Sequence, residues 1–469
     1  MTKIGFLSAF LFILVFACKK ETALPSTPQP STKDTVVGTV SSYEGRVPEL
    51  FINTLGNTIV NEPKKPATLT VLVTDTITLK AQIGIELRGS SSLYFDQKSY
   101  GFEFRNSAGE GIDTTILDLP KEEDFILYGP ANDKSLLRNV IIYELSNQIG
   151  WYASRTRFVQ LHINGSYNGL YVLMEKIKRN KNRVNISKIA SDNTGGYIIK
   201  IDKSSGDATG KPDNYYDESF SWRSSFDPSG TLLGFAPYGP KKGAETYFIY
   251  EYPKPDNITT AQKDYIKKYI DDFEKALLSQ SFKDASSGYR NFIDVDSFID
   301  YFLLNELSHN PDAYRLSTFL YKDKSAKLKI GPIWDFNLAF GNDSRTAIAA
   351  PYNWAYNFNN YFPSDGWLVN FWWKRLLSDP FFTNQLKSRW ANLRSHAFSE
   401  SNIYSIIDSK ISLLTSHKSI VRHFARWNFL GVKLPFNGFV GQTYQEEVDY
   451  LKNWIRQRLQ WMDQNISSL

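Results

Sequence analysis

Two aspartates stand in surroundings that are poor in polar groups, and they suggest metal-assisted chemistry. Asp312 follows a strongly apolar helical pattern, and Asp335 stands among large apolar residues in the stretch 331–340. An ionised carboxylate in such a setting is costly unless a positive group pairs with it, and a bound metal ion would supply that charge. A phosphoryl-transfer site needs two such carboxylates, one to position the attacking hydroxyl and one to hold magnesium.

The length and composition leave room for a large folded body. With 469 residues and about one domain per 150 residues, the chain has two or three domains or one two-lobed unit. Phe, Trp and Tyr make up 15% of the residues, which favours large cores and clefts lined by rings. The net charge of +5 is spread along the chain without a dense Lys/Arg run, so no nucleic-acid partner is expected.

The N-terminus has the pattern of an export signal. Residues 1–17 contain Lys3 and then a short apolar run, which is typical of a secretory signal peptide. Cys18, the single cysteine of the chain, follows a small residue as in a bacterial lipobox, so we expect an exported protein, lipid-anchored in the bacterial envelope at the outer membrane or cell surface. The alternative is ordinary signal cleavage that leaves Cys18 as a spare thiol. Residues 18–43, rich in Pro, Ser and Thr, predict a flexible linker.

The next part of the sequence has the period of β-strands. Apolar and polar residues alternate over much of 47–105, and a strand over 98–104 places Lys98 on the same face as Tyr100 and Phe102. The small-residue turn after Arg88 could wrap backbone amides and the Lys98 ammonium around phosphates. The alternative is an ordinary turn with Lys98 reaching water.

A helix and a hairpin follow this turn. Asp133 or Ser135 can cap a helix that ends near residue 148, with Arg138 off its apolar stripe and therefore expected on a solvated face. The strand that ends in Met174 and Glu175 could present its backbone to a nucleotide base or be the edge of a sheet. After a strand near 197–202, helical periods dominate over 259–277, 294–307 and 367–469, where several tryptophans occupy core positions.

Other catalytic chemistries have little support. The five histidines lack the close spacing of a metal site, and the position of Cys18 excludes a cysteine nucleophile. A Gly-x-Ser-x-Gly elbow, which would indicate a hydrolase, does not occur.

Several separate motifs, taken in order, resemble one family. Over about residues 47–390 the chain resembles the CotH-type kinases, named for a spore-coat protein, and the motifs that carry the likeness are Arg88-Gly89-Ser90-Ser91, the Lys98 strand, Leu136-Leu137-Arg138-Asn139, Asn168-Gly169-Leu170-Tyr171, Asn310-Pro311-Asp312 and Trp334-Asp335-Phe336-Asn337. The resemblance implies an α+β, atypical protein-kinase-like fold with two lobes. The N-lobe, residues 44–177, would be mostly β, and the C-lobe, residues 178–469, would be mostly helical and carry the catalytic loop.

The resemblance also implies roles for individual residues. Asp312 would be catalytic, accepting or orienting the substrate hydroxyl proton, and Asp335 would hold Mg²⁺ or Mn²⁺. Ser317 stands where kinases usually place an Asn metal ligand, and Asn337 stands where relatives often have a second Asp; both can still offer an oxygen. The residues implied in ATP binding are Lys98, Arg88, Gly89, Ser90, Ser91, Arg138, Met174 and Glu175, the last two in an inter-lobe hinge.

Three functions are compatible with this sequence. The first is a protein kinase that transfers the ATP γ-phosphoryl group to Ser or Thr of exported or surface proteins. The second is a pseudokinase or surface-anchored binding protein, because the two altered polar positions weaken the metal site. The third is a purely structural component of the coat or envelope.

Overall fold

The alternating N-terminal residues form a sheet that closes on itself. The structure is a computed structural model, and it describes residues 36–37, 43, 45–190, 195–203, 218–237 and 245–469. The predicted signal segment, Cys18 and most of the predicted linker lie outside the described residues. Residues 35–469 form one compact unit.

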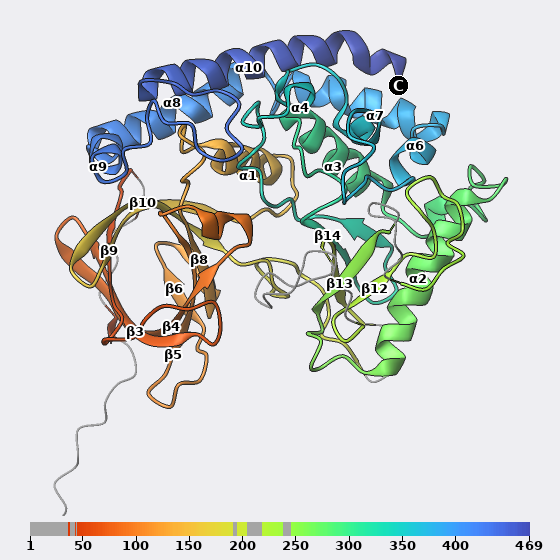
Figure 1. Cartoon of the computed structure of the whole chain (residues 1–469). Coiled ribbons are helices and arrows are strands. Elements are labelled where there is room, and N and C mark those ends of the chain that lie inside the picture. Colours follow the sequence, from red (N-terminus) through yellow and green to blue (C-terminus); the bar gives the residue numbers. More distant parts are fainter. Residues whose placement is uncertain (1–35, 38–42, 44, 191–194, 204–217, 238–244) are drawn as a thin grey trace, which may run out of the picture. The chain divides into compact units, whose positions relative to one another are not determined.

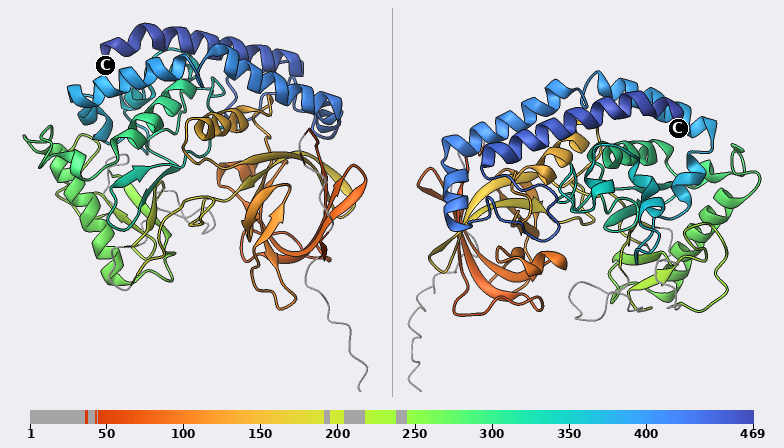
Figure 2. Two further views of the ribbon diagram at one scale, coloured as in Figure 1. Left: turned by 180° about the vertical axis from the view of Figure 1, so that it is seen from behind. Right: turned by 45° about the horizontal axis from the view of Figure 1, so that its top comes forward.

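The closed sheet is built from strands with one apolar face. Its strands, in spatial order, are β1 (Val36–Val37), β4 (Thr76–Arg88), β3 (Lys65–Val73), β2 (Glu49–Asn53), β9 (Thr156–Ile163), β10 (Ser166–Glu175), β8 (Asp124–Tyr128) and β5 (Ser99–Arg105). Pairing of β4 with β5 closes the ring, and the neighbours are antiparallel except for the parallel pair β2 and β9. Figures 1 and 2 show the closed barrel. Leu50, Val71, Phe102 and Leu173 belong to the buried core that its strands form.

A second antiparallel sheet belongs to the C-terminal part. Its spatial order is β12 (Ser221–Arg223), β13 (Tyr247–Tyr252), β11 (Tyr197–Ile201), β14 (Thr318–Lys322) and β15 (Leu328–Ile330). A separate small hairpin pairs β6 (Thr114–Ile116) with β7 (Leu119–Glu122). The boundary predicted at residue 177 falls just after β10, between the barrel and this second sheet.

The described chain also contains α-helices, all but one of them after residue 259. They are α1 (Arg138–Gln148), α2 (Thr260–Leu278), α3 (Val295–Ser308), α4 (Thr346–Ala349), α5 (Phe358–Tyr361), α6 (Trp372–Leu376), α7 (Pro380–Arg394), α8 (Glu400–Ser416), α9 (Ser419–Arg426) and α10 (Tyr444–Asn465). Side-chain caps set several of their starts, for example the capping box between Thr259 and Gln262 at α2. Among the described residues, none of the helices combines the length and hydropathy needed to cross a bilayer.

Aromatic side chains build the core of the C-terminal part. Trp372 and Trp373 are fully buried, and Phe273 and Phe298 pack against them, so the predicted core role of these tryptophans is confirmed. Figure 1 shows α8 and α10 side by side over this region. A sheet-rich N-terminal part followed by a helix-rich part confirms the α+β class and is consistent with a two-lobed kinase-like fold.

One buried acid in this core is held in its neutral form. Glu274 of α2 accepts hydrogen bonds from the Ser224 hydroxyl at 2.7 Å and from Trp372 Nε1 at 3.0 Å. Burial raises the pKa of Glu274 to about 8, although both hydrogen bonds oppose the shift. The folded protein therefore keeps a proton at neutral pH that the unfolded chain releases.

This burial predicts a pH dependence of stability that Glu274→Gln removes. Between pH 5 and pH 8 the folded state binds more protons than the unfolded state. As the pH rises through this range, the free energy of unfolding of the wild type should therefore fall relative to that of Glu274→Gln, by at most about 1.4 kcal/mol per pH unit. Urea unfolding of both proteins across this range measures the difference. Exposed Glu110→Gln serves as the control, and wild-type and Glu274→Gln curves that stay parallel with pH would contradict the assignment.

Candidate functional site

An antiparallel hairpin brings the segments of Asp312 and Asp335 to the same end of the second sheet. The chain leaves α3 through His309 in left-handed conformation, passes Asp312 and enters β14, and it leaves β15 shortly before Asp335. Leu320 pairs with Ile330, so residues that precede β14 lie beside residues that follow β15. The sequence pattern predicted a helix-loop-strand unit carrying the two aspartates, and the structure has a two-stranded hairpin between them.

Asp335 does not lie in the apolar setting that its neighbours in sequence suggested. Its side chain is exposed, while Ile333 and Phe336 are buried on either side of it. The cause is a left-handed backbone at Asp335, with φ of +65°, which turns this residue away from the core. The argument from costly burial is therefore wrong for Asp335, whose carboxylate lies at the surface.

Helix α1 holds the residues around Asp335. We call residues 334–339 the Asp335 loop. The backbone N–H of Asp335 donates to Tyr143 Oη at 3.1 Å, and the N–H of Phe336 donates to Asn139 Oδ1 at 2.8 Å. The Tyr143 ring stacks on Trp334, with 6.1 Å between centroids and 19° between planes. Tyr143 was not among the predicted site residues, and Asn139 stood in a family motif without a role, because a helical period alone does not distinguish either from a core residue.

Two predicted metal ligands carry neutral oxygens: Asn337, two residues after Asp335, and Ser317, five residues after Asp312. Asn337 donates its Nδ2 to Asn132 Oδ1 at 3.1 Å, which leaves the Asn337 Oδ1 to face another group. Ser317 is partly exposed and has a left-handed backbone with φ of +47°. Carboxylate, amide and hydroxyl oxygens, the groups that Asp335, Asn337 and Ser317 carry, are ligand types that Mg²⁺ and Mn²⁺ accept.

Asp312 has a different electrostatic neighbourhood. Its Oδ1 accepts from Arg315 Nη2 at 2.8 Å, and its side chain is 23% exposed whereas that of Arg315 is 3% exposed. Arg315 also contacts Asp365 at 3.2 Å, and Arg345 binds Asp343 at 2.7 Å. In the described part of the chain no donor is bonded to Oδ2 of Asp312, so this oxygen can accept from a substrate.

The turn after Arg88 lies next to the Asp335 loop. The Arg88 guanidinium stands 5.7 Å from the centroid of the Trp334 ring. Gly89 has φ of +110°, and a β-carbon there would clash with the Ser92 hydroxyl, so the turn requires glycine at this position. Ser90 accepts the N–H of Leu93 at 3.1 Å, and the backbone of Ser91 begins a short 3₁₀ turn. Arg88 is thus the residue of this turn that a contact joins to the Asp335 loop.

Lys98 is placed differently from the expectation. Its ammonium donates to the Leu93 carbonyl at 2.6 Å, which ties it to its own turn. Lys98 precedes β5, and the alternation of this strand places Lys98 on the same face as Tyr100 and Phe102. That face points into the barrel, and the opposite face points toward the C-terminal core. Sequence alternation thus placed Lys98 on the apolar face of its strand. It could not show that the candidate site lies beside the opposite face.

Arg138, Met174 and Glu175 also differ from their predicted settings. Arg138 is 1% exposed rather than solvated, and its guanidinium is bonded to Asp133 at 2.6 Å. Met174 is buried, and β10 pairs with β8 on one side and β9 on the other, so its backbone is not a free edge. Glu175 is fully buried and accepts from Arg155 at 2.7 Å. Burial and internal bonding give these three side chains a structural role, and their predicted part in ATP binding stays a prediction.

The outer face of the barrel carries a second cation. The register aligns Glu86, Gly101, Ile126 and Met174 in one row, and by alternation Arg88 and Lys176 share that face. Burial lowers the pKa of Lys176, and the positive charges of Arg88 and Lys64 lower it further, against the opposing effect of Asp124 at 3.7 Å. Crowded positive charges of this kind favour an anionic ligand.

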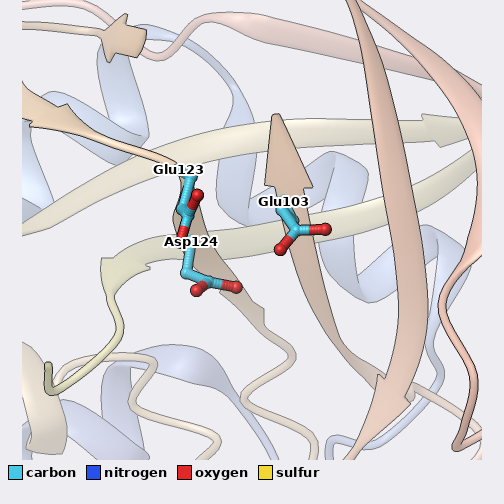
Figure 3. Close-up of side chains that lie close together, drawn as sticks. All are labelled: Glu103, Glu123 and Asp124. Carbon is cyan, nitrogen blue, oxygen red and sulfur yellow. The ribbon is translucent and has the colours of Figure 1, made fainter. Parts of the chain in front are cut away.

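A group of acidic residues on the barrel surface is compensated by lysines. Oxygens of Glu103, Glu123 and Asp124 lie within 4.8 Å of one another (Figure 3). Lys64 binds Asp124 at 2.7 Å, and Lys178 binds Glu123 at 2.5 Å and Asp124 at 2.8 Å. An ion-pair network therefore accounts for this cluster without a metal ion.

A surface groove lies at the opposite ends of α1 and α3 from the candidate site. It has a volume of about 710 Å³ and is lined by Trp151, Asp296, Asp300 and residues of α7. Asp300 is already engaged by Arg389 at 2.8 Å and by Trp151 Nε1 at 2.7 Å. None of the predicted site residues lines this groove.

Comparison with known proteins now decides the family. Residues 85–462 match the family described as CotH kinase protein, which is most of the chain. The chain belongs to the CotH kinase family. No curated protein matches the sequence. Membership implies a kinase-like activity and the use of ATP, and the matched region contains Arg88, Asp312, Asp335 and the hairpin between the two aspartates.

The geometry of this site predicts that Arg88 matters more for nucleotide binding than Lys98. Arg88→Met should weaken binding of MgATP by about tenfold or more, because a charge-assisted contact to phosphate is lost. Lys98→Met should cost at most about threefold, because the ammonium is engaged by the Leu93 carbonyl. Titration calorimetry measures both, and Arg88→Lys tests whether charge alone suffices. A larger loss for Lys98→Met would restore the role first expected for Lys98.

Proposed function

We propose that this CotH family member is a protein kinase that transfers the ATP γ-phosphoryl group to Ser or Thr hydroxyls of exported or cell-surface proteins. The observation that carries the proposal is the β14–β15 hairpin, which brings the Asp312 and Asp335 segments to one end of a sheet. Arg88 stands beside the same end through its contact with Trp334. Two acids of separate function and a facing cation are what phosphoryl transfer requires.

The donor set supports a divalent cation at Asp335. The exposed carboxylate of Asp335 would hold Mg²⁺ or Mn²⁺, with oxygens of Asn337 and Ser317 as the candidates for further ligands that the family pattern suggests. Such a cation, when bound, would neutralise charge on the transferring phosphoryl group. Only one of these three side chains is charged, so most of the cation's remaining ligands must come from nucleotide phosphates and water.

Asp312 is the residue suited to handle the substrate proton. Arg315 holds Oδ1 of Asp312, which fixes the direction of the side chain, and Oδ2 can accept from the attacking hydroxyl. As the hydroxyl oxygen bonds to the γ-phosphorus, the bond from that phosphorus to the β–γ bridging oxygen breaks and ADP leaves. The hydroxyl proton passes to Asp312, and positive charges at Arg88 and Lys176 would face the phosphates.

The site of action is proposed from the N-terminal sequence. A signal segment at 1–17 and a lipid on Cys18 would anchor the protein in the bacterial envelope, at the outer membrane or cell surface, with residues 18–43 as a tether. The protein substrates would then be exported or surface proteins. Mass measurement of the membrane-extracted protein and of Cys18→Ala tests this anchor, because lipidation adds a mass that the variant lacks.

A second candidate function is a pseudokinase that binds protein or glycan at the envelope. The observation that favours it is that Ser317 and Asn337 are neutral and that Asp312 is paired with Arg315. A protein of this kind would keep the fold and lose transfer. Thermal stability indifferent to MgATP would favour this function over the kinase.

Substitution of the two aspartates separates their roles. Asp335→Asn should abolish the stabilisation of the folded body by MgATP or MnATP, because the charged cation ligand is lost. Asp312→Asn should keep near-normal nucleotide binding and lose about 100-fold or more of the transfer rate, since only proton acceptance is affected. Melting curves with nucleotide and transfer of labelled phosphate to a protein acceptor measure the two effects.

Asp449→Asn, an exposed carboxylate on α10, is the control for both measurements. Label incorporation by the wild type that persists in Asp335→Asn would contradict the metal role. Absence of label in every protein, together with melting curves that do not change with nucleotide, would exclude the kinase.

A further inference from the structure

Five contacts tie the Asp335 loop to α1. Tyr143 stacks on Trp334, its hydroxyl accepts the Asp335 N–H, and the edge of its ring meets Phe336 at 6.4 Å and 81°. Asn139 accepts the Phe336 N–H, and Arg138 Nε donates to the Ala339 carbonyl at 3.0 Å. One face of a single helix therefore sets the path of the backbone on both sides of Asp335.

The Tyr143 hydroxyl acts on a strained position. A non-glycine residue in left-handed conformation costs about 1 kcal/mol or more, so the surroundings must hold it there. Asp335 has φ of +65°, and the hydroxyl that accepts its N–H comes from a ring that is 1% exposed. Burial also raises the pKa of Tyr143, which keeps the hydroxyl protonated and neutral beside the Asp335 charge.

We propose that Tyr143 is a positioning residue for the cation site, acting through the backbone of Asp335 and not as a ligand of the cation. By accepting the Asp335 N–H, Tyr143 holds the left-handed backbone that turns the Asp335 carboxylate outward to the cation. The inference rests on the proposed function of Asp335 as the cation ligand. It adds that cation affinity is set by the contact of α1 with the Asp335 loop.

A purely structural role for Tyr143 would have a different signature. Most of the packing of Tyr143 comes from its ring, which Phe retains, so Tyr143→Phe removes one hydrogen bond and leaves the stacking on Trp334. If the hydroxyl only stabilised the fold, its loss would lower the melting temperature and leave the cation affinity unchanged. If it positions Asp335, the cation affinity changes and saturating cation restores the bound state.

Two other tyrosines provide matched controls. Tyr128 lies close enough to Asp335 for their charges to interact, but its buried hydroxyl makes no hydrogen bond within the described part of the chain. Tyr289 is fully buried, and its hydroxyl donates to Asp379 at 2.9 Å, a hydrogen bond that does not involve the Asp335 loop. Tyr128→Phe therefore controls for proximity, and Tyr289→Phe controls for the loss of a buried hydrogen bond.

The experiment measures Mn²⁺ binding in the presence of fixed ADP. The Mn²⁺ concentration at half-maximal binding, followed by the paramagnetic signal of free Mn²⁺, should rise about three- to tenfold in Tyr143→Phe and stay within about twofold in both controls. Amide hydrogen exchange in the Asp335 loop should become faster in Tyr143→Phe and stay unchanged in both tyrosine controls. Asn139→Ala, which removes the acceptor of the next N–H, should shift both readouts in the same direction and tests the inference should Tyr143→Phe fail to fold.

The outcomes separate this inference from the proposed function. A wild type that binds no Mn²⁺ with ADP overturns the kinase proposal, and the role of Tyr143 falls with it. A wild type that binds Mn²⁺ while Tyr143→Phe shows the same half-maximal concentration overturns the positioning role alone. Faster exchange in the Asp335 loop without a change in Mn²⁺ affinity overturns it too, because the hydrogen bond would then be purely structural.

Discussion

The arrangement of the site depends on the buried ion pair between Arg138 and Asp133 at the start of α1. Both side chains are 1% exposed, and the pair is 2.6 Å apart, so neither charge can lose its partner without a large desolvation cost. The Arg138 N–H also donates to Asp133 Oδ2 at 2.8 Å, which fixes where the helix begins. Because the same guanidinium reaches Ala339, the position of α1 and the path of the Asp335 loop are set together.

A second buried ion pair gives the Asp312 side of the site a comparable anchor. Glu306 of α3 and Arg458 of α10 are fully buried, and Glu306 also accepts the N–H groups of Ala355 and Tyr356 and the hydroxyl of Tyr314. The pair joins the helix that precedes Asp312 to the C-terminal helix and to the segment that follows the Asp335 loop. Helices distant in the sequence therefore support each aspartate, and the residues of both ion pairs lie within the matched range 85–462.

The sequence predicted elements and family well, but it predicted side-chain environments poorly. Periodicity located α2, α3 and β11, because each keeps one apolar face, and separated motifs in order indicated the family. The large apolar neighbours of Asp335 predicted an apolar setting for its side chain. The prediction failed because the sequence pattern cannot anticipate a left-handed residue, which reverses the direction of one side chain. Arg138 was expected in solvent because it lies off the apolar stripe of its helix. Its buried partner, Asp133, precedes the helix and lies outside the helical period, so periodicity gave no sign of the ion pair.

Exposure of Asp335 changes what its chemistry depends on. A buried carboxylate would attract a cation through its own unbalanced charge, whereas water screens an exposed one. In the proposed cation site Asn337 and Ser317 are neutral, so the protein would supply little charge for a free divalent ion. Mg²⁺ commonly combines one or two carboxylates with substrate phosphates, so the nucleotide would complete the proposed site. Cation and nucleotide should then bind together, and the fixed direction of one carboxylate becomes more important than its basicity.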